Sequence, residues 1–260
     1  MRYARFEKNN TVACGIIEGD TIKLIAGEIL DGGAPTGETV ALDTVKLLAP
    51  VIPETFYAAG LNYVAHIMEQ AEARGAKPNI PEKPDIGYRA NNALIGHEDT
   101  IVIPKDATEL IEYEAELVVV IGKEAKHLSE AEALSCVFGY TIGNDVSERT
   151  WQRGDRTFWR GKNADTFKPM GPWIETNLDL NSLETVVRLN GEETIRFETN
   201  NMLFGIERYI SAMSQYLTLH PGDVIWMGTE GKSPQMKHGD ICEIDISSIG
   251  TLRNPVIRES

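Results

Sequence analysis

Short apolar runs separated by turn residues recur along this chain and constrain its fold more than any other feature. The segment EYEAELVVVIGK, at 112–123, has the strongest strand pattern. Its first half alternates apolar with acidic residues, and its second half is continuously apolar, which is typical of a strand that enters a buried sheet. Because such runs outnumber helical patterns, the sequence predicts a mostly β fold of the α+β class, with helical insertions.

Turn signals place further strands on both sides of this segment. Two hairpins are predicted, at 12–25 around a Glu-Gly-Asp turn and at 182–197 around an Asn-Gly turn. Residues 93–104 have strand character around a polar turn. Two apolar segments near the C-terminus, 222–229 and 239–257, are also predicted to be strands.

Helical spacing of apolar residues is limited to a few segments. It predicts helices over 64–75 and 205–217 and a short capped helix within 129–140. Two prolines close together after the first strands favour an extended linker. The sequence therefore predicts a small N-terminal β domain over 1–50 and a larger domain over 51–260.

Charge and composition exclude several classes of partner. The chain has 25 basic and 39 acidic residues, a net charge of −14, so repulsion disfavours nucleic acid and anionic membrane surfaces. No stretch approaches the ~20 apolar residues of a membrane span, and the N-terminus lacks the apolar run of a secretory signal. Cys14, Cys136 and Cys242 are far apart, which predicts free thiols in a reducing cytoplasm.

Three carboxylates are candidate metal ligands. Glu114 and Glu116 are two residues apart on the predicted strand, so both side chains lie on the same face. Two adjacent carboxylates repel each other, and a hard divalent cation relieves that repulsion. Asp145, at the end of the next apolar run, is a candidate third ligand. The alternatives are a solvent-facing acidic stripe for the glutamates and a turn aspartate for Asp145.

Other residues are candidates for catalysis or binding. His66 and Glu69 are three residues apart on a predicted helix, where a carboxylate can orient an imidazole as a general base; a surface ion pair is the alternative. Lys162 lies in an irregular loop and can bind a carboxylate or an enolate. Gly228 and Thr229 close an apolar strand, where a backbone N–H and a hydroxyl can hold a carboxylate. An ordinary turn at the strand end is the alternative there.

Six segments occur in a specific order along the chain. They are GLNYVAHIMEQ, ALIGHEDTIVIP, EYEAELVVVIGK, GYTIGNDVSERTWQ, RGKNADTFKPMGPW and GDVIWMGT. Together they resemble the fumarylacetoacetate hydrolase family, over roughly residues 50 to 255. The resemblance implies a mixed β-sandwich roll with a small N-terminal β domain, assembled as a homodimer.

The resemblance also implies roles for individual residues. It implies a divalent metal, Mg²⁺ or Mn²⁺ with Ca²⁺ as a substitute in a crystal, held by Glu114, Glu116 and Asp145. His66 and Glu69 correspond to a catalytic dyad on a mobile helix. The further site residues that it implies are Lys162, Gln152 and Thr229.

Three positions depart from the family's pattern. Arg89 stands where many members have a lysine, Glu148 where a small residue is commoner, and 230–234 replaces the usual Pro-x-Gly-Val-Gly. We expect Arg89 to bind a distal carboxylate or other polar group of the substrate, because a guanidinium binds a carboxylate through two parallel hydrogen bonds. The alternative is a surface arginine paired with Asp85 or Glu98.

The expected reaction is metal-assisted hydrolysis of a C–C bond in an acylpyruvate or other β-diketo acid. Decarboxylation of an oxaloacetate-like acid and isomerisation of a 2-hydroxyhepta-2,4-diene-1,7-dioate-type acid use the same enolate and stay open. In each case the partner is a small oxo acid. A calcium-binding β module without catalysis is the alternative from another class. We also expect Asp145→Ala to leave the fold intact, because it removes one of several repelling anions.

Overall fold

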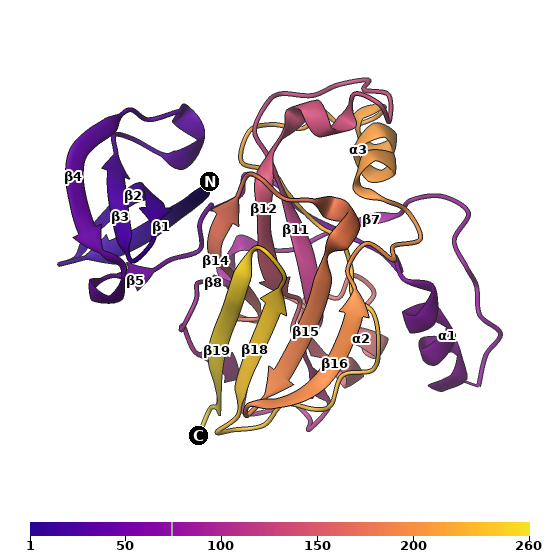
Figure 1. The fold of residues 1–260 in the computed structure, drawn as a ribbon. Helices are drawn as coiled ribbons and strands as arrows, with labels where there is room; N and C mark the ends of the chain where they lie inside the picture. Colours follow the sequence, from indigo (N-terminus) through magenta and orange to yellow (C-terminus); the bar gives the residue numbers. More distant parts are fainter. Residues whose placement is uncertain (74) are drawn as a thin grey trace.

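The computed structural model describes residues 1–73 and 75–260, and most of its regular structure is β-strand (Figure 1). The strands are β1 Arg2–Lys8, β2 Thr11–Glu18, β3 Thr21–Ile25, β4 Pro35–Ala41, β5 Lys46–Leu47, β6 Phe56–Ala59, β7 Ile86–Tyr88, β8 Leu94–Ile95, β9 Ile101–Ile103, β10 Ile111–Glu112, β11 Ala115–Ile121, β12 Val137–Asn144, β13 Ser147–Glu148, β14 Lys168–Glu175, β15 Glu184–Leu189, β16 Glu192–Glu198, β17 Val224–Trp226, β18 Ile241–Ile246 and β19 Gly250–Arg258. The α-helices are α1 Val64–Ala73, α2 Arg149–Gly154 and α3 Ile206–Ser214. Short 3₁₀ helices cover Ile29–Asp31, Leu42–Thr44, Asn91–Ala93, Ala133–Cys136 and Leu180–Ser182.

One large sheet runs through most of the molecule. Its strand order is β4-β3-β2-β1-β14-β12-β11-β17-β6-β7, with β5 on β1 and β8 on β14. Strands β1 to β5 lie together at one side of the molecule (Figure 1), and β1 joins them to the rest by pairing with β14. The predicted division near residue 50 stays a prediction, because this pairing shows only that the two parts share a sheet.

A second sheet packs against the first. Its order is β16-β15-β18-β19-β9, and its apolar side chains share one core with Leu117 and Val119 of β11. The alternate residues Val118 and Val120 face a second core around Trp226. Strand β11 is therefore buried on both faces, which explains its continuous apolar run. Each fully buried aliphatic side chain of this kind contributes ~1.5–3 kcal/mol.

Close packing of β12 requires a glycine. A Cβ on Gly143 would lie 2.6 Å from the Trp226 ring, well inside van der Waals contact. Gly143 pairs with Glu116 of β11. The missing side chain thus lets an indole pack beside the β11–β12 pair, two residues before Asp145.

Several sequence predictions are confirmed. The structure is mostly β, both hairpins form, α1 and α3 lie in the predicted segments, and the three cysteines are free. None of the described helices is both long and apolar enough to cross a bilayer.

One prediction is wrong in detail. The helix expected within 129–140 is one 3₁₀ turn, Ala133–Cys136, because Val137 already belongs to β12. The strand character predicted for 93–104 is confirmed by β8 and β9, of which β8 pairs with β14 and β9 with β19 of the other sheet.

Candidate metal centre and active site

The three predicted carboxylates meet at the junction of two neighbouring strands. Glu114 and Glu116 flank the first residue of β11, and Asp145 directly follows β12. The antiparallel β11–β12 pairing places Ala115 opposite Asn144, and the Asp145 N–H donates to the Glu114 carbonyl oxygen at 2.9 Å. The register of one strand pair therefore brings together residues that are about thirty positions apart.

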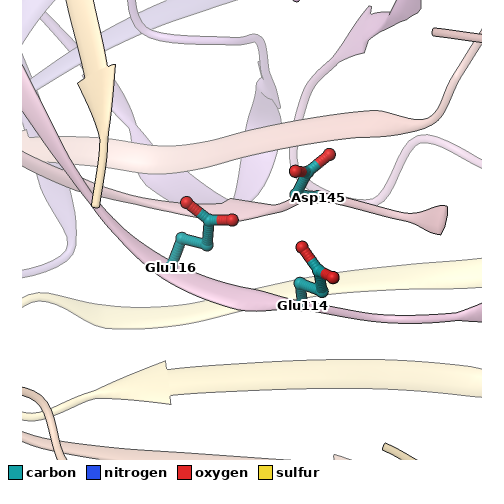
Figure 2. Close-up of side chains that lie close together, drawn as sticks. All are labelled: Glu114, Glu116 and Asp145. Carbon is teal, nitrogen blue, oxygen red and sulfur yellow. The ribbon is translucent and has the colours of Figure 1, made fainter. Parts of the chain in front are cut away.

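The carboxyl groups point toward one another in the interior of the protein. Figure 2 shows them converging on one space. One oxygen from each lies within 4.8 Å of those from the other two. Glu114, Glu116 and Asp145 are 6, 2 and 0% exposed.

Basic side chains surround two of these carboxylates. The Lys162 ammonium bridges Glu114 and Asp145, at 2.6 and 2.7 Å. Arg149 donates to the other Glu114 oxygen at 2.7 Å, and Lys162 and Arg149 hold the pKa of Glu114 down at about 2 despite its burial.

Two further basic side chains contact Asp145. The Arg89 guanidinium donates to both of its oxygens, with the shortest contact at 2.7 Å, and the fully buried Lys168 ammonium lies 2.7 Å from Oδ1. Lys168 also donates to the carbonyl oxygens of Val146 and Phe167. Arg89, Lys162 and Lys168 hold the pKa of Asp145 well below its usual range, against the desolvation that would raise it.

Glu116 has a different environment. Its described hydrogen bond is from the backbone N–H of Gly228, at 2.7 Å. Burial, together with the negative charges of Asp145 and Glu114, raises its pKa to about 8.

These residues fit a divalent cation. They supply three converging carboxylate oxygens, the donor type that Mg²⁺ and Mn²⁺ prefer. Burial and the anionic neighbours of Glu116 raise its pKa to about 8, and a bound cation would oppose that effect. Of the predicted ligands, the structure brings all three together.

A cavity of about 220 Å³ opens beside the carboxylates and collects most of the other candidate residues. Besides the three carboxylates, its lining includes Arg89, Lys162, Gly228, Thr229, His66 and Gln152. Gly161 lets the loop that carries Lys162 lie close to helix α2, because a Cβ at position 161 would lie only 2.6 Å from the Gln152 backbone nitrogen. Neighbouring strand ends and the start of helices α1 and α2 therefore converge on one cavity.

The predicted pair of His66 and Glu69 is not in contact in this structure. His66 Nδ1 lies 3.1 Å from the carbonyl oxygen of Gly231. No hydrogen bond or ion pair of the described chain joins the imidazole to Glu69, whose buried Oε2 has no hydrogen-bond partner among the described residues. Glu69 instead lines a second cleft that adjoins the first.

Arg89 lies in the lining of the cavity beside the carboxylates. Its side chain, 9% exposed, is bound to Asp145. The alternative that pairs it with Asp85 or Glu98 is wrong: Asp85 accepts from a backbone N–H, and Glu98 pairs with Arg253. The expected contact of Arg89 with a distal group of the substrate stays a prediction. In this structure the guanidinium contacts Asp145, a candidate metal ligand.

Sequence reasoning missed two basic residues of this site. Arg149 belongs to the NDVSER motif, so its place in the site had a signal in the sequence. The sequence signal for Lys168 is weaker: this lysine begins an otherwise apolar segment, KPMGPW. Its burial depends on the counter-charge of Asp145, which pattern analysis does not show.

Comparison with known proteins identifies the class to which this fold and site belong. Residues 55–257 match the family model described as fumarylacetoacetate (FAA) hydrolase C-terminal, and residues 1–50 match Rv2993c-like, N-terminal. The chain belongs to the fumarylacetoacetate hydrolase family, a family of enzymes that includes hydrolases, isomerases and tautomerases.

Particular relatives differ in their named activities. The chain is 40% identical to a 2,4-didehydro-3-deoxy-L-rhamnonate hydrolase of Sphingomonas sp. over 98% of this chain and 96% of the relative. It is 36% identical to a mitochondrial oxaloacetate tautomerase of Xenopus laevis over 82% and 69% of the two chains.

Two solved structures cover the whole of both chains. The crystal structure of 5-carboxymethyl-2-hydroxymuconate delta-isomerase from Mycobacterium smegmatis has a TM-score of 0.90 and 39% identity. Maleylpyruvate hydrolase from Sphingobium sp. SYK-6, with a TM-score of 0.81 and 25% identity, was solved with manganese(II) and pyruvate. The fold of this family is thus shared by enzymes of more than one reaction, and one of these two structures contains a bound metal.

Proposed function

We propose that this protein is a divalent-metal-dependent hydrolase that cleaves a C–C bond in an acylpyruvate, a 2,4-dioxo acid. The observation that carries the proposal is the convergence of three buried carboxylates with an imidazole and a lysine on one cavity. Mg²⁺ or Mn²⁺ would be held by Glu114, Glu116 and Asp145. Bound there, it would polarise the keto oxygen of a 2-oxo acid and stabilise the adjacent enolate.

His66 is suited to remove a proton from water. A carbonyl oxygen only accepts hydrogen bonds, so the contact with Gly231 requires the proton on Nδ1 and leaves the lone pair on Nε2. Nε2 takes the water proton, and the hydroxide adds to the carbonyl distant from the carboxylate. The C–C bond then breaks to release a carboxylic acid and the enolate of pyruvate, which is protonated on carbon.

Other side chains of the cavity stabilise charge. Gln152 accepts from Arg149 through Oε1, so its amide NH₂ remains available to donate to the oxyanion that forms on hydration. The Lys162 ammonium, already bound to two carboxylates, supplies positive charge beside the 2-oxo acid.

Keto–enol tautomerisation of a 2-oxo acid is the second candidate. It uses the same enolate and needs a base but no water. The support is an imidazole without a carboxylate partner in the described contacts, together with relatives named as an oxaloacetate tautomerase and a delta-isomerase. A calcium-binding module without catalysis is not supported, since the family is one of enzymes.

The test is turnover of acetylpyruvate and of enol-oxaloacetate by the metal-free protein, with and without Mg²⁺ or Mn²⁺. Hydrolysis predicts metal-dependent loss of ultraviolet absorbance with equal amounts of acetate and pyruvate formed. His66→Ala should lower this rate by ~10²–10⁴-fold, the usual contribution of a general base. Lys237→Met, an exposed lysine outside the cavity, is the control and should change nothing.

Contrary results separate the alternatives. Rapid ketonisation of enol-oxaloacetate without acetate from acetylpyruvate would favour the tautomerase. Metal binding with no turnover of any 2-oxo acid would refute both enzyme proposals.

A further inference from the structure

Glu148 is a buried carboxylate outside the metal cluster. It is fully buried, and it lies outside the described lining of both cavities. Its described hydrogen-bond partners are two backbone N–H groups and one hydroxyl, all of them uncharged. Removing a carboxylate from water is costly when only neutral donors satisfy it, so the presence of Glu148 at this position requires a physical reason.

The hydrogen bonds of Glu148 join three segments of the chain. Its Oε2 accepts from the backbone N–H of Trp151 in the first turn of α2. Its Oε1 accepts from the hydroxyl of Thr108 and, at 3.3 Å, from the backbone N–H of the same residue, in the loop before β10. The backbone N–H of Glu148 donates to the Gly161 carbonyl oxygen at 2.8 Å, beside Lys162. One residue therefore connects α2 with two loops.

Capping of α2 does not by itself explain a glutamate. Glu148 is the N-cap residue of this helix, and the residues preferred at an N-cap are Ser, Thr, Asp and Asn, whose side chains are short. Any of these could accept from the Trp151 N–H. The longer side chain of glutamate also brings a second oxygen to Thr108. What the glutamate adds is therefore the connection between α2 and the loop before β10.

Helix α2 carries two residues of the proposed active site. Arg149 begins the helix and donates to Glu114 at 2.7 Å and to the Gln152 side-chain oxygen at 2.9 Å. Gln152 lies one turn after the capped start and lines both cavities. A helix of six residues has few internal hydrogen bonds, so its placement depends on the contacts of its first turn.

We infer that Glu148 is a positioning residue for the proposed reaction. By joining Thr108 to the start of α2, it fixes the Gln152 amide where the oxyanion forms. The inference rests on the proposed function for the role of Gln152. A misplaced amide stabilises the transition state less but does not weaken substrate binding, so its loss should appear in kcat and not in KM.

Two variants break the connection from opposite sides. Glu148→Asp keeps a favoured N-cap but is too short to reach Thr108, and Thr108→Val removes the hydroxyl donor. With acetylpyruvate and Mg²⁺, each should lower kcat by about 10-fold and leave KM within about twofold, since a small misplacement of a reacting group can cost up to ~100-fold. A role in capping alone predicts wild-type kcat for Glu148→Asp, and that result would overturn the inference.

Glu109→Gln is the matched control. It changes the residue next to Thr108, whose side chain is 79% exposed and pairs with Arg258 at the surface. Exposed pairs of this kind contribute only ~0–1 kcal/mol, so neither kcat nor KM should change.

A double-mutant cycle tests whether Glu148 acts through Gln152. Gln152→Ala should lower kcat by about 100-fold or more, the usual effect of losing a donor to an oxyanion. If Glu148 acts by placing that amide, Glu148→Asp should lower kcat no further in the Gln152→Ala protein. Effects that multiply would show that the two residues act independently, contrary to the inference.

Nuclear magnetic resonance of the metal-free protein gives a readout that needs no turnover. The side-chain amide signals of Gln152 are assigned by their loss in Gln152→Ala. They should shift or broaden in Glu148→Asp and Thr108→Val and stay unchanged in Glu109→Gln. If the wild type does not cleave acetylpyruvate, the proposed function fails and these signals decide the inference alone. Unchanged signals in both variants would refute it.

Discussion

Glu116→Gln should stabilise the metal-free protein, whereas Asp145→Asn should destabilise it. The two residues are neighbours in the same cluster, yet their environments have opposite electrostatic character. Burial and two neighbouring anions raise the pKa of Glu116, whereas the cations around Asp145 lower its pKa. An amide removes repulsion in the first case and removes a counter-ion in the second.

The magnitude for Glu116 follows from its pKa. A rise from the ordinary 4.5 to about 8 means that the native state binds the proton more tightly than the unfolded state. The resulting penalty is absent below pH 4.5, grows as the pH rises and is complete above pH 8. At 1.36 kcal/mol per pKa unit it reaches about 3 kcal/mol at pH 7 and about 5 kcal/mol at pH 9. Glu116→Gln removes this penalty.

The magnitude for Asp145 follows from Lys168. Lys168 is fully buried, which lowers its pKa to about 7, and it would lose its charged partner. The buried Arg89 guanidinium, which stays charged at any working pH, would lose the same partner. Breaking a buried pair in this way typically costs 3–5 kcal/mol. We therefore no longer expect Asp145→Ala to leave the fold intact. That expectation considered only the repulsion among the carboxylates, and the loss of a counter-ion is the larger effect.

The assay is urea unfolding followed by tryptophan fluorescence, in chelator, at several pH values. Glu116→Gln should unfold at higher urea than wild type at pH 8, with the difference vanishing near pH 4.5. Saturating Mn²⁺ should reverse the order, because only the wild type retains all three ligands. Destabilisation by Glu116→Gln at pH 8 in chelator would refute the electrostatic reasoning.

Three further predictions follow from the same geometry. Because Glu116 is largely protonated at pH 7, Mn²⁺ binding should release close to one proton, measured by calorimetry in buffers of different ionisation enthalpy; no buffer dependence would contradict this. Gly161→Ala should lower kcat/KM at least 10-fold by pushing the loop away from α2, whereas Gly154→Ala, with no atom near its added Cβ, should be neutral. Arg89→Met should change kcat/KM equally for acetylpyruvate and for a dicarboxylic analogue, because Arg89 contacts Asp145; a selective loss with the dicarboxylate would restore its predicted role in substrate binding.

The sequence by itself determined the local features of this protein. Alternation of period two specifies a strand and places Glu114 and Glu116 on one face, since the positions of adjacent side chains follow from backbone geometry alone. Turn residues likewise specify both hairpins. The ordered motifs identified the family, because the order of motifs can be read from the sequence without knowing which residues are in contact.

Only the tertiary structure decided which distant residues meet. Lys168 begins β14, which pairs with β12, whereas Arg89 follows β7 at the end of the sheet, and both side chains reach Asp145. Strands β8 and β9 join different sheets although one turn separates them. Contacts of this kind depend on strand register and on how buried charges find counter-ions, neither of which a local pattern specifies. For the same reason the sequence predicted three like carboxylates, whereas the fold gives Asp145 a lowered pKa and Glu116 a raised one.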